Sequence, residues 1–565
     1  MNVLPQGMVA TPWSKTCDET GWFRTKIGVQ TSVKKTQSSQ LTARRFTYGV
    51  LFGKVPLVVV TSLRRKLSVT AALGLLLIPG CRASEEILPY AEAIRTPVED
   101  FSGLPVSSST VESEHSTVFY RYPRLGQSHP LTVEIRTIMA QRQTTFLEDL
   151  PEEGTPELHQ DMDFLAVSPE VVGARITADS PDDFGDEFGV ETLWYDAASD
   201  TVLPWTALFT DENALEEVHL AVADVLENEY DMSLEQLPGL VGEVALRNQE
   251  ETEEQEGSAD DEQSDGDGPL DLSDPEQAQQ AAEQWADSPL ADLAFSTDGG
   301  LAVRMNPEDV PDADPANELT LPVEPDNLEE FLSTFGYRAR DAAVSNDPSD
   351  LPDEELTEHG VTLDCERLKC VALTFDDGPG EHTDRLLEML ADYDAHATFY
   401  VLGSLVEEYP DVLERMHTQG HELGNHTWKH DDLAGMSAKE IREDIERTND
   451  SVSQIIGVEP STIRPPYGSS NDTVHETVDQ PLILWDVDTM DWQNRDSEAV
   501  AEHAIDNTAP GSVLLFHDIH GSTVDAIPDV LEELHNSGYH FVTVADLFGF
   551  NELDAGETYT DARVD

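Results

Sequence analysis

The stretch Val371-Ala-Leu-Thr-Phe-Asp-Asp-Gly-Pro-Gly380 decides how the C-terminal part of this chain folds. Its first half is an apolar run of the length expected for a buried strand. Gly378 and Pro379 then end the strand and turn the chain. Asp376 and Asp377 therefore stand together at the end of a rigid element, where one carboxylate can bind a cation while the other acts as a base. Taken alone, Asp-Asp-Gly is more typical of a surface turn.

Apolar strands and amphipathic helices alternate from about residue 361 to residue 550. This alternation favours a parallel α/β barrel or sheet, in which functional side chains gather at the carboxyl ends of the strands. The expected strands are 371–375, 397–401, 422–424, 463 onward, 482–485, 512–516 and 540–544.

Two histidines, His426 and His430, follow the short strand 422–424. Their spacing places both side chains on one face of a helical turn, from which they can bind one cation. Such a pair by itself is usually incidental, but two histidines and one carboxylate are a common set for a catalytic zinc. We expect Asp377, His426 and His430 to hold a divalent metal, with Zn²⁺ as the first choice and Co²⁺ or Mn²⁺ as alternatives.

Two further strand ends carry chemistry. In Arg464-Pro-Pro-Tyr467, the prolines fix the backbone, so the N–H of Tyr467 can point into a pocket as an oxyanion donor. His517 follows the strand 512–516, and a histidine beside a metal site suits a general acid. Alone, His517 is more simply interpreted as a buried structural histidine. A fifth strand, 482–485, is followed by Asp488 and Asp491. Catalytic groups at five strand ends are far less expected by chance.

These segments resemble the polysaccharide deacetylases of carbohydrate esterase family four, the NodB-homology fold. The resemblance covers about the last third of the chain. It implies a distorted (β/α)7 barrel and metal-dependent removal of N- or O-acetyl groups from sugars. The matching motifs are Thr374-Phe-Asp-Asp-Gly378, His426-Thr-Trp-Lys-His430, Arg464-Pro-Pro-Tyr467, Asp488-Thr-Met-Asp491-Trp492 and Leu515-Phe516-His517.

The resemblance also implies a role for each motif residue. Asp376 is the general base and His517 the acid that protonates the leaving amine, while the three residues named above bind the metal. The Tyr467 N–H stabilises the oxyanion, and Leu515 lines the acetyl pocket.

Three more motif residues support this centre by the same resemblance. Arg464 and Asp491 are expected to orient Asp376 and to pack beside Trp492. Trp492 is counted with Leu515 as substrate-binding.

The N-terminal part of the chain has the features of an export signal. Arg64-Arg65-Lys66 precede the apolar run Leu67–Ile78, which is too short for a stable membrane anchor. Cys81 follows Pro79-Gly80 and resembles the lipobox cysteine of bacterial lipoproteins, which implies lipid on its sulfur. We expect residues 61–81 to be a signal peptide and residues 1–60 to be absent from the mature protein. A buried core helix is the alternative.

The middle of the chain reads as a separate, smaller α+β domain. It loosely resembles the domain shared by RsiV-type anti-sigma factors and some peptidoglycan deacetylases. An insert within it is acidic and poor in apolar residues, so we expect it to be disordered. The expected boundaries are a tether at 82–115, the α+β domain at 116–340 with its insert at 248–287, a linker at 341–360, the deacetylase domain at 361–550 and a tail at 551–565.

Composition limits the partners and the compartment. The chain holds 33 basic and 112 acidic residues, a formal net charge of −79. Its overall field therefore disfavours nucleic acid and anionic membranes. Cys365 and Cys370 lie five residues apart, and in an exported protein they can close a short loop as a disulfide. Two free thiols are the alternative, and the pair offers too few ligands for a metal.

Together these features predict an exported, lipid-anchored deacetylase on the outer face of the bacterial membrane. Its expected substrate is N-acetylated cell-wall polysaccharide, with peptidoglycan favoured because the anchor holds the enzyme beside the wall. A chitooligosaccharide or acetylxylan deacetylase is the alternative with the same mechanism. A wall-binding or signalling module is the alternative of another class, and the complete set of acid, base and metal ligands argues against it.

Overall fold

The computed structural model describes most of the chain beyond residue 89. The described residues are 90–345, with gaps at 99–100, 102–105, 127–128, 149, 152–153, 180–188, 258–267, 312 and 314–317, then 363–549 and 553–563. The expected signal peptide, Cys81 and most of the linker at 341–360 lie outside them. Residues from Ala83 to Asp565 group as one compact unit. Among the described residues, no helix has the length and apolar character needed to cross a membrane.

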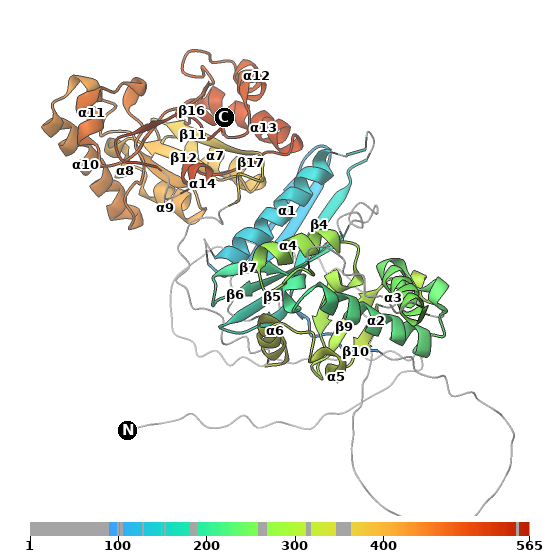
Figure 1. The fold of residues 1–565 in the computed structure, drawn as a ribbon. Coiled ribbons are helices and arrows are strands. Elements are labelled where there is room, and N and C mark those ends of the chain that lie inside the picture. Colours follow the sequence, from blue (N-terminus) through green and yellow to red (C-terminus); the bar gives the residue numbers. More distant parts are fainter. Residues whose placement is uncertain are drawn as a thin grey trace, which may run out of the picture. The chain divides into compact units, whose positions relative to one another are not determined.

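The first half of the described chain is built on a mainly antiparallel sheet (Figure 1). Its order is β2-β3-β4-β5-β6-β7, and β1 pairs with β4. Strands β3 and β4 are parallel, because helix α1 (Pro130–Glu148) connects them as a crossover. The strands are β1 (Thr96–Pro97), β2 (Val106–Glu112), β3 (Thr117–Pro123), β4 (Glu157–Val167), β5 (Val171–Asp179), β6 (Val190–Asp196) and β7 (Thr201–Pro204).

A second layer continues this α+β region. A small antiparallel sheet, β10-β9-β8, packs with the helices around buried Trp194 and Phe295. The elements are α2 (Glu212–Glu229), α3 (Gly239–Gly257), α4 (Pro275–Gln284), β8 (Leu293–Phe295), β9 (Leu301–Met305), β10 (Leu319–Val323), α5 (Pro325–Leu328) and α6 (Thr334–Ser345).

The expectation of a disordered insert at 248–287 is wrong for much of that segment. Helix α3 continues to Gly257, and α4 covers 275–284. The start of α3 buries Val241 and Val244, and Glu and Gln propagate a helix well once it has begun. Helix α4 has Pro275 in its first turn, is capped by Asp274, and buries two alanines. Residues 258–267 lie outside the described part.

Two expected boundary segments also belong to the folded regions. The tether at 82–115 contains β1 and β2, which pair with β4 and β3. The tail at 551–565 contains β18 (Thr558–Tyr559), which lies parallel to β14 (Leu482–Ile483). β1 and β18 are only two residues long, and β2 is rich in serine, so the sequence of these segments gives a weak strand signal.

The C-terminal region alternates parallel strands and helices, as predicted. Figure 1 shows helices arranged around the strands β11, β12 and β16. The strands are β11 (Cys370–Asp376), β12 (Ala397–Val401), β13 (Glu422–Asn425), β14, β15 (Val487–Asp488), β16 (Val513–His517), β17 (His540–Phe541) and β18. The helices are α7 (Thr383–Asp392), α8 (Gly403–Val406), α9 (Pro410–Thr418), α10 (Ala438–Ile456), α11 (Asp472–Thr477), α12 (Ser497–Asn507), α13 (Gly521–Asn536) and α14 (Val544–Phe548).

The parallel ladder runs β13-β12-β11-β16-β15, and single bridges join Asn425 to Ile463 and Ile463 to Leu482. The strand pairs among the described residues do not close into a ring. A mixed α/β fold is thus established, and a closed barrel stays a prediction.

Cys365 and Cys370 form a disulfide with an S–S distance of 2.06 Å. The bond closes a short loop immediately before β11. It thereby restrains the chain at the entry to the strand that ends in Asp376.

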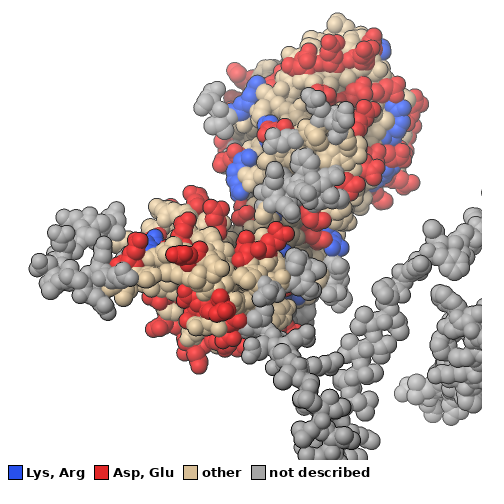
Figure 2. All heavy atoms as spheres, turned by 90° about the vertical axis from the view of Figure 1, so that its right-hand side faces the viewer, with Lys and Arg blue, Asp and Glu red and all other residues tan. Residues whose placement is uncertain are grey.

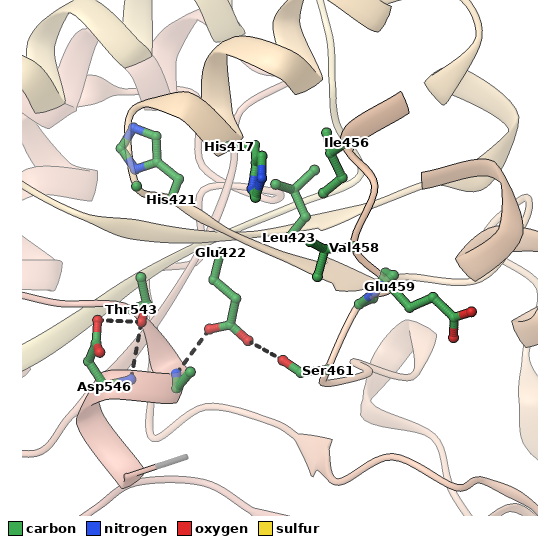
Figure 3. Close-up of a pocket in the computed structure, with 13 residues that line it drawn as sticks. His417, His421, Glu422, Leu423, Ile456, Val458, Glu459, Ser461, Thr543 and Asp546 are labelled. Carbon is green, nitrogen blue, oxygen red and sulfur yellow. Dashed lines mark hydrogen bonds between the residues drawn. The ribbon is translucent and has the colours of Figure 1, made fainter. Parts of the chain in front are cut away.

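A cavity of about 160 Å³ lies at the amino ends of the strands, away from the catalytic motifs. Figure 3 shows Glu422, at the start of β13, accepting a hydrogen bond from Ser461. Thr398, Thr462 and the Ala545 N–H also donate to the Glu422 carboxylate. Because these contacts join β13 to β12, to the segment 461–462 and to α14, Glu422 has a structural role at this end.

The acidic composition appears on the surface. Figure 2 shows Asp and Glu side chains spread over the face that it draws, with few Lys and Arg among them. This distribution fits solubility better than a site for a polyanion.

Candidate active site

The catalytic motifs converge at the carboxyl ends of the parallel strands. Asp376 at the end of β11 lies directly opposite His517 at the end of β16 in the strand register. On the other side of β11, β12 leads to β13, which delivers His426. The expectation that these side chains meet at one edge of the sheet is therefore confirmed by the pairing.

Asp377, His426 and His430 come together as the expected metal-ligand set. The Oδ1 atom of Asp377 lies 3.6 Å from Nε2 of His426 and 3.5 Å from Nε2 of His430. One ligand atom from each residue falls within a group no wider than 4.8 Å. Distances of this size leave space for an ion between the three atoms.

The hydrogen bonding of Asp377 and His426 fits a cation. The Oδ1 atom of Asp377 is buried and has no hydrogen-bond partner among the described residues. The Nδ1 of His426 lies 2.7 Å from the carbonyl oxygen of Arg464, to which it donates, so Nε2 carries the free lone pair. Burial lowers the pKa of His426 and keeps it neutral, as a metal ligand must be. The donor set matches zinc and related divalent ions.

The two histidines are not on a helical turn, contrary to the prediction. They flank a tight turn in which Thr427 and His430 have positive φ angles, 68° and 65°. The turn is held by hydrogen bonds from the Thr427 N–H to Asn425 and from the His430 N–H to the Thr427 hydroxyl. The spacing of four residues thus brings the rings together by a different local geometry.

Arg464 holds Asp376 as predicted. Its Nη1 lies 2.9 Å from Oδ1 of Asp376 and 2.6 Å from the hydroxyl oxygen of Thr374. The remaining guanidinium N–H groups donate to the carbonyls of Ile483 and Leu484. Both members of this pair are almost fully buried, and the adjacent guanidinium fixes Asp376 in position.

Asp491 contacts His517 and not Asp376, which corrects the predicted role. Its Oδ1 accepts from Nδ1 of His517 at 2.8 Å, and its Oδ2 accepts from the His517 N–H and the Thr523 hydroxyl. Burial acts to lower the pKa of His517, but the hydrogen bond and charge of Asp491 outweigh it and raise that pKa to about 9. Nε2 of His517 therefore carries a proton at neutral pH.

The remaining predicted residues lie around this centre. Tyr467 has a positive φ of 63°, and its exposed ring packs edge-on against His430 at 4.5 Å between centroids. Leu515 is buried two residues before His517 on β16, and so faces the same side of the strand. Trp492 is half exposed, and its indole N–H donates to Asp488. It does not form a described hydrogen bond with Arg464 or Asp491.

Sequence reasoning missed several supporting residues. The Thr523 hydroxyl donates to Asp491, and the Thr374 hydroxyl accepts from Arg464. Asp518 is fully buried beside the turn that follows Asp377. A Cβ added to Gly378 would lie 2.4 Å from an Asp518 oxygen. Only the position of Asp518 directly after His517 gave a signal, since Thr and Asp are otherwise too common to single out.

Comparison with known proteins agrees with this site. Residues 364–480 match the family described as polysaccharide deacetylase. The peptidoglycan-N-acetylmuramic acid deacetylase PdaC of Bacillus subtilis is 41% identical over 180 residues, which are 32% of this chain and 38% of that protein. A peptidoglycan-N-acetylglucosamine deacetylase of Bacillus cereus is 35% identical over 191 residues, 32% of this chain and 89% of that protein.

A solved structure described as T48 deacetylase with substrate is 43% identical, covers 35% of this chain and 98% of its own, and has a TM-score of 0.34. The chain spans less than half the length of the first curated relatives, 38% and 43%. The match over most of the shorter Bacillus cereus relative, together with the family match, shows that this chain is a member of the polysaccharide deacetylase family.

Proposed function

We propose that the C-terminal region removes N-acetyl groups from cell-wall polysaccharide in a metal-dependent hydrolysis. The observation that carries the proposal is the buried, unpartnered Oδ1 of Asp377 facing Nε2 of both His426 and His430. Peptidoglycan is the favoured substrate because several relatives carry peptidoglycan deacetylase names. The closed (β/α)7 barrel of the resemblance belongs to the same proposal.

A divalent cation held by Asp377, His426 and His430 would supply a Lewis acid that makes water nucleophilic near neutral pH. Asp376, fixed in position by Arg464, takes the proton from the attacking water. The prolines before Tyr467 and its positive φ give its backbone N–H a fixed direction, which suits stabilisation of a negative oxygen.

His517 supplies the other proton. Its protonated Nε2 donates to the nitrogen of the leaving amine, while Asp491 fixes the ring through Nδ1 and stabilises the imidazolium. Leu515, on the same side of β16, provides an apolar surface for the acetyl methyl group. The half-exposed indole of Trp492 offers a face on which a sugar ring can pack.

We further propose that residues 61–81 direct export and that Cys81 carries the lipid anchor at the outer face of the membrane. The basic-then-apolar pattern ahead of Pro79-Gly80-Cys81 supports this. Labelling cells with a radioactive fatty acid should mark the wild-type protein and leave Cys81→Ser unlabelled. Equal labelling of both would refute the anchor.

Acetate release tests the activity. Purified residues 83–565, which form one compact unit, are incubated with peptidoglycan and with a chitin oligomer, as purified, after chelation, and after Zn²⁺ is restored. We expect release from peptidoglycan that disappears on chelation and returns with metal. Undiminished release after complete metal removal would refute the metal dependence.

The choice of substrate sharpens the result. Release from the oligomer alone would keep the chemistry and overturn the wall substrate. Analysis of the products by mass spectrometry then shows whether the muramic or the glucosamine residues lose acetate. Chelation followed by Co²⁺ or Mn²⁺ instead of Zn²⁺ tests the metal.

A further inference from the structure

The α+β region contains a second hollow that no catalytic motif explains. A groove of about 730 Å³ lies along β7, the last strand of its sheet, and is lined by α1, β6, β7 and α4. Its apolar walls include Ile138, Leu193, Leu203 and Trp205, each less than a tenth exposed. Figure 1 shows the four elements in this region.

Arg142 is the unusual residue of this groove. Its side chain is only 7% exposed, yet its Nη1 and Nη2 atoms are buried without a hydrogen-bond partner among the residues that the structure describes. The nearest carboxylate, that of Glu191, is 3.9 Å from Nη2, which is too long for a hydrogen bond. Burying a guanidinium costs free energy unless it is paired and hydrogen-bonded. The described residues supply no such partner to the Nη atoms of Arg142, so a ligand can fill that role.

The geometry favours a carboxylate as that partner. Nη1 and Nη2 of one guanidinium match the two oxygens of a carboxylate in a bidentate pair. Because the Glu191 side chain is 48% exposed, it can turn towards solvent when a ligand binds Arg142. Glu134 and Arg367 also line the groove and pair with each other, whereas Glu283 adds a further negative charge, so a ligand with an additional positive charge is favoured over a polyanion.

The strand edge favours a peptide over a sugar. Among the described strands β7 pairs only with β6, so one side of its backbone faces no other strand. An extended peptide can lie against such an edge and use its main-chain groups, while its terminal carboxylate reaches a specific pocket.

We propose that this groove binds the carboxyl end of a short peptide that also carries an ammonium group, with Arg142 as the carboxylate anchor. Peptidoglycan carries short peptides, so the site would hold the polymer while the C-terminal region acts on its sugars. That link to the wall rests on the proposed function, whereas peptide binding itself does not.

Isothermal titration calorimetry with residues 83–565 tests the proposal, using the tripeptide Ala-Lys-Ala with a free carboxyl end as the probe. We expect binding that weakens at least tenfold for the C-terminal amide of the same peptide. Arg142→Gln should also weaken binding at least tenfold, because a neutral amide cannot form the charged pair. Arg247→Gln, at an exposed pair with Glu216 outside the groove, is the matched control and should leave the Kd unchanged.

Glu191→Gln distinguishes a ligand site from a structural ion pair. If Glu191 competes with the ligand for Arg142, this variant binds the peptide more tightly. A purely structural pair predicts lower stability and no gain in affinity. If Arg142→Gln fails to fold, the proposal is still tested by two measurements. These are the difference in Kd between the free-acid and amide peptides on the wild type, and the Kd of Glu191→Gln.

No binding of the free acid, equal Kd values for acid and amide, or unchanged binding by folded Arg142→Gln would overturn the proposal. The measurement needs no deacetylation, so it can be repeated on Asp376→Asn protein with the same expected Kd. Binding without acetate release would uphold the groove and count against the proposed function. Acetate release without peptide binding would support the proposed function and count against the groove as a peptide site.

Discussion

The two folded regions differ in which buried charged groups lack a hydrogen-bond partner among the described residues. In the α+β region, Asp292 accepts two hydrogen bonds from Arg175, and Asp196 accepts two from Arg338. In the C-terminal region, Asp377 has a buried oxygen with no hydrogen-bond partner. A buried charge that is fully paired stabilises one conformation, whereas one left without a partner indicates a ligand. Among the described residues of the α+β region, Arg95, Arg124 and Arg136 also have such an atom, and Arg142 is the arginine in which both Nη atoms lack a partner.

Backbone conformation separates the regions in the same way. Eight described residues other than glycine have positive φ, and five of them lie on the catalytic loops: Asp377, Thr427, His430, Tyr467 and Met490. The α+β region has such residues at Asp200 and Asp231, where Asp tolerates the left-handed conformation of a turn. Conformations of this kind persist where the surrounding structure imposes them, and they concentrate here at the site.

The largest expected effect comes from Asp376→Asn. Loss of the base should lower acetate release by about 10³-fold, within the range for general acid–base catalysis. The metal ligands are untouched, so metal content by mass spectrometry should stay the same. Asp200→Asn is the matched change in the α+β region and should keep full activity. Near wild-type release by Asp376→Asn would remove the assigned role and weaken the contrast between the regions.

A smaller effect is expected for Asp491→Asn. The pKa of His517 is raised from 6.5 to about 9 mainly by Asp491 against the opposing effect of burial. Activity of the wild type, which needs the protonated ring, should fall as pH rises through the His517 pKa. The variant should lose about 10²-fold in kcat and reach its alkaline decline at lower pH. An unshifted pH–rate profile would argue against the acid role.

The same pair also predicts how stability depends on pH. Because the folded pKa lies above the unfolded value, the pair stabilises the protein fully below about pH 6.5. This stabilisation is lost as pH rises towards 9. Chemical denaturation of wild type and Asp491→Asn across this range should give a difference that shrinks with increasing pH.

Two glycines against aromatic rings offer a matched pair of changes. A Cβ on Gly173 would lie 2.6 Å from the Trp194 ring, and one on Gly424 would lie 2.3 Å from the Tyr400 ring. Each Ala variant should lose about 1–3 kcal/mol of stability through overpacking. Only Gly424→Ala should also lower activity on a small substrate, since Gly424 is two residues before His426. Equal activity losses in the two variants would show that overpacking in the α+β region disturbs the catalytic site as much as overpacking beside it.

The smallest expected effect is that of the disulfide. Cys365→Ala with Cys370→Ala should reduce the free energy of unfolding by about 2 kcal/mol, because the bond closes only a short loop. Thermal unfolding under oxidising conditions measures the loss, and acetate release at 25 °C should persist. A reductant should lower the Tm of the wild type and not that of the double variant.

Sequence patterns predicted the catalytic region better than the α+β region, for physical reasons. A buried parallel strand such as β11 is a continuous apolar run, and the motif residues follow it directly. The segment Leu131–Ile135 alternates in the manner of a strand, yet it begins α1. Its buried residues Leu131, Ile135 and Ile138 follow the helical repeat instead. Alternation of apolar and polar residues over only five positions does not distinguish a strand from a helix. The pattern over the whole of α1 is needed to tell them apart.

The site shows the corresponding limit. The five motifs pointed to the residues that meet at the candidate metal site and to the proposed base and acid, since each motif follows a strand whose end is fixed by the fold. The partner of Asp491 was assigned wrongly because its loop approaches His517 only in three dimensions. Arg142 gave no signal at all, because an Arg within a helix is common and its lack of a hydrogen-bond partner is visible only in the packed structure.

The pairing of β18 with β14 has a consequence for proteolysis. Residues 558–559 lie beside Leu482 and Ile483 in the strand ladder, and the Ala562 N–H donates to the Gly511 carbonyl. Proteolytic removal of residues 558–562 would leave backbone groups of β14 without these partners. Such a cut would loosen the catalytic region although it removes no motif residue.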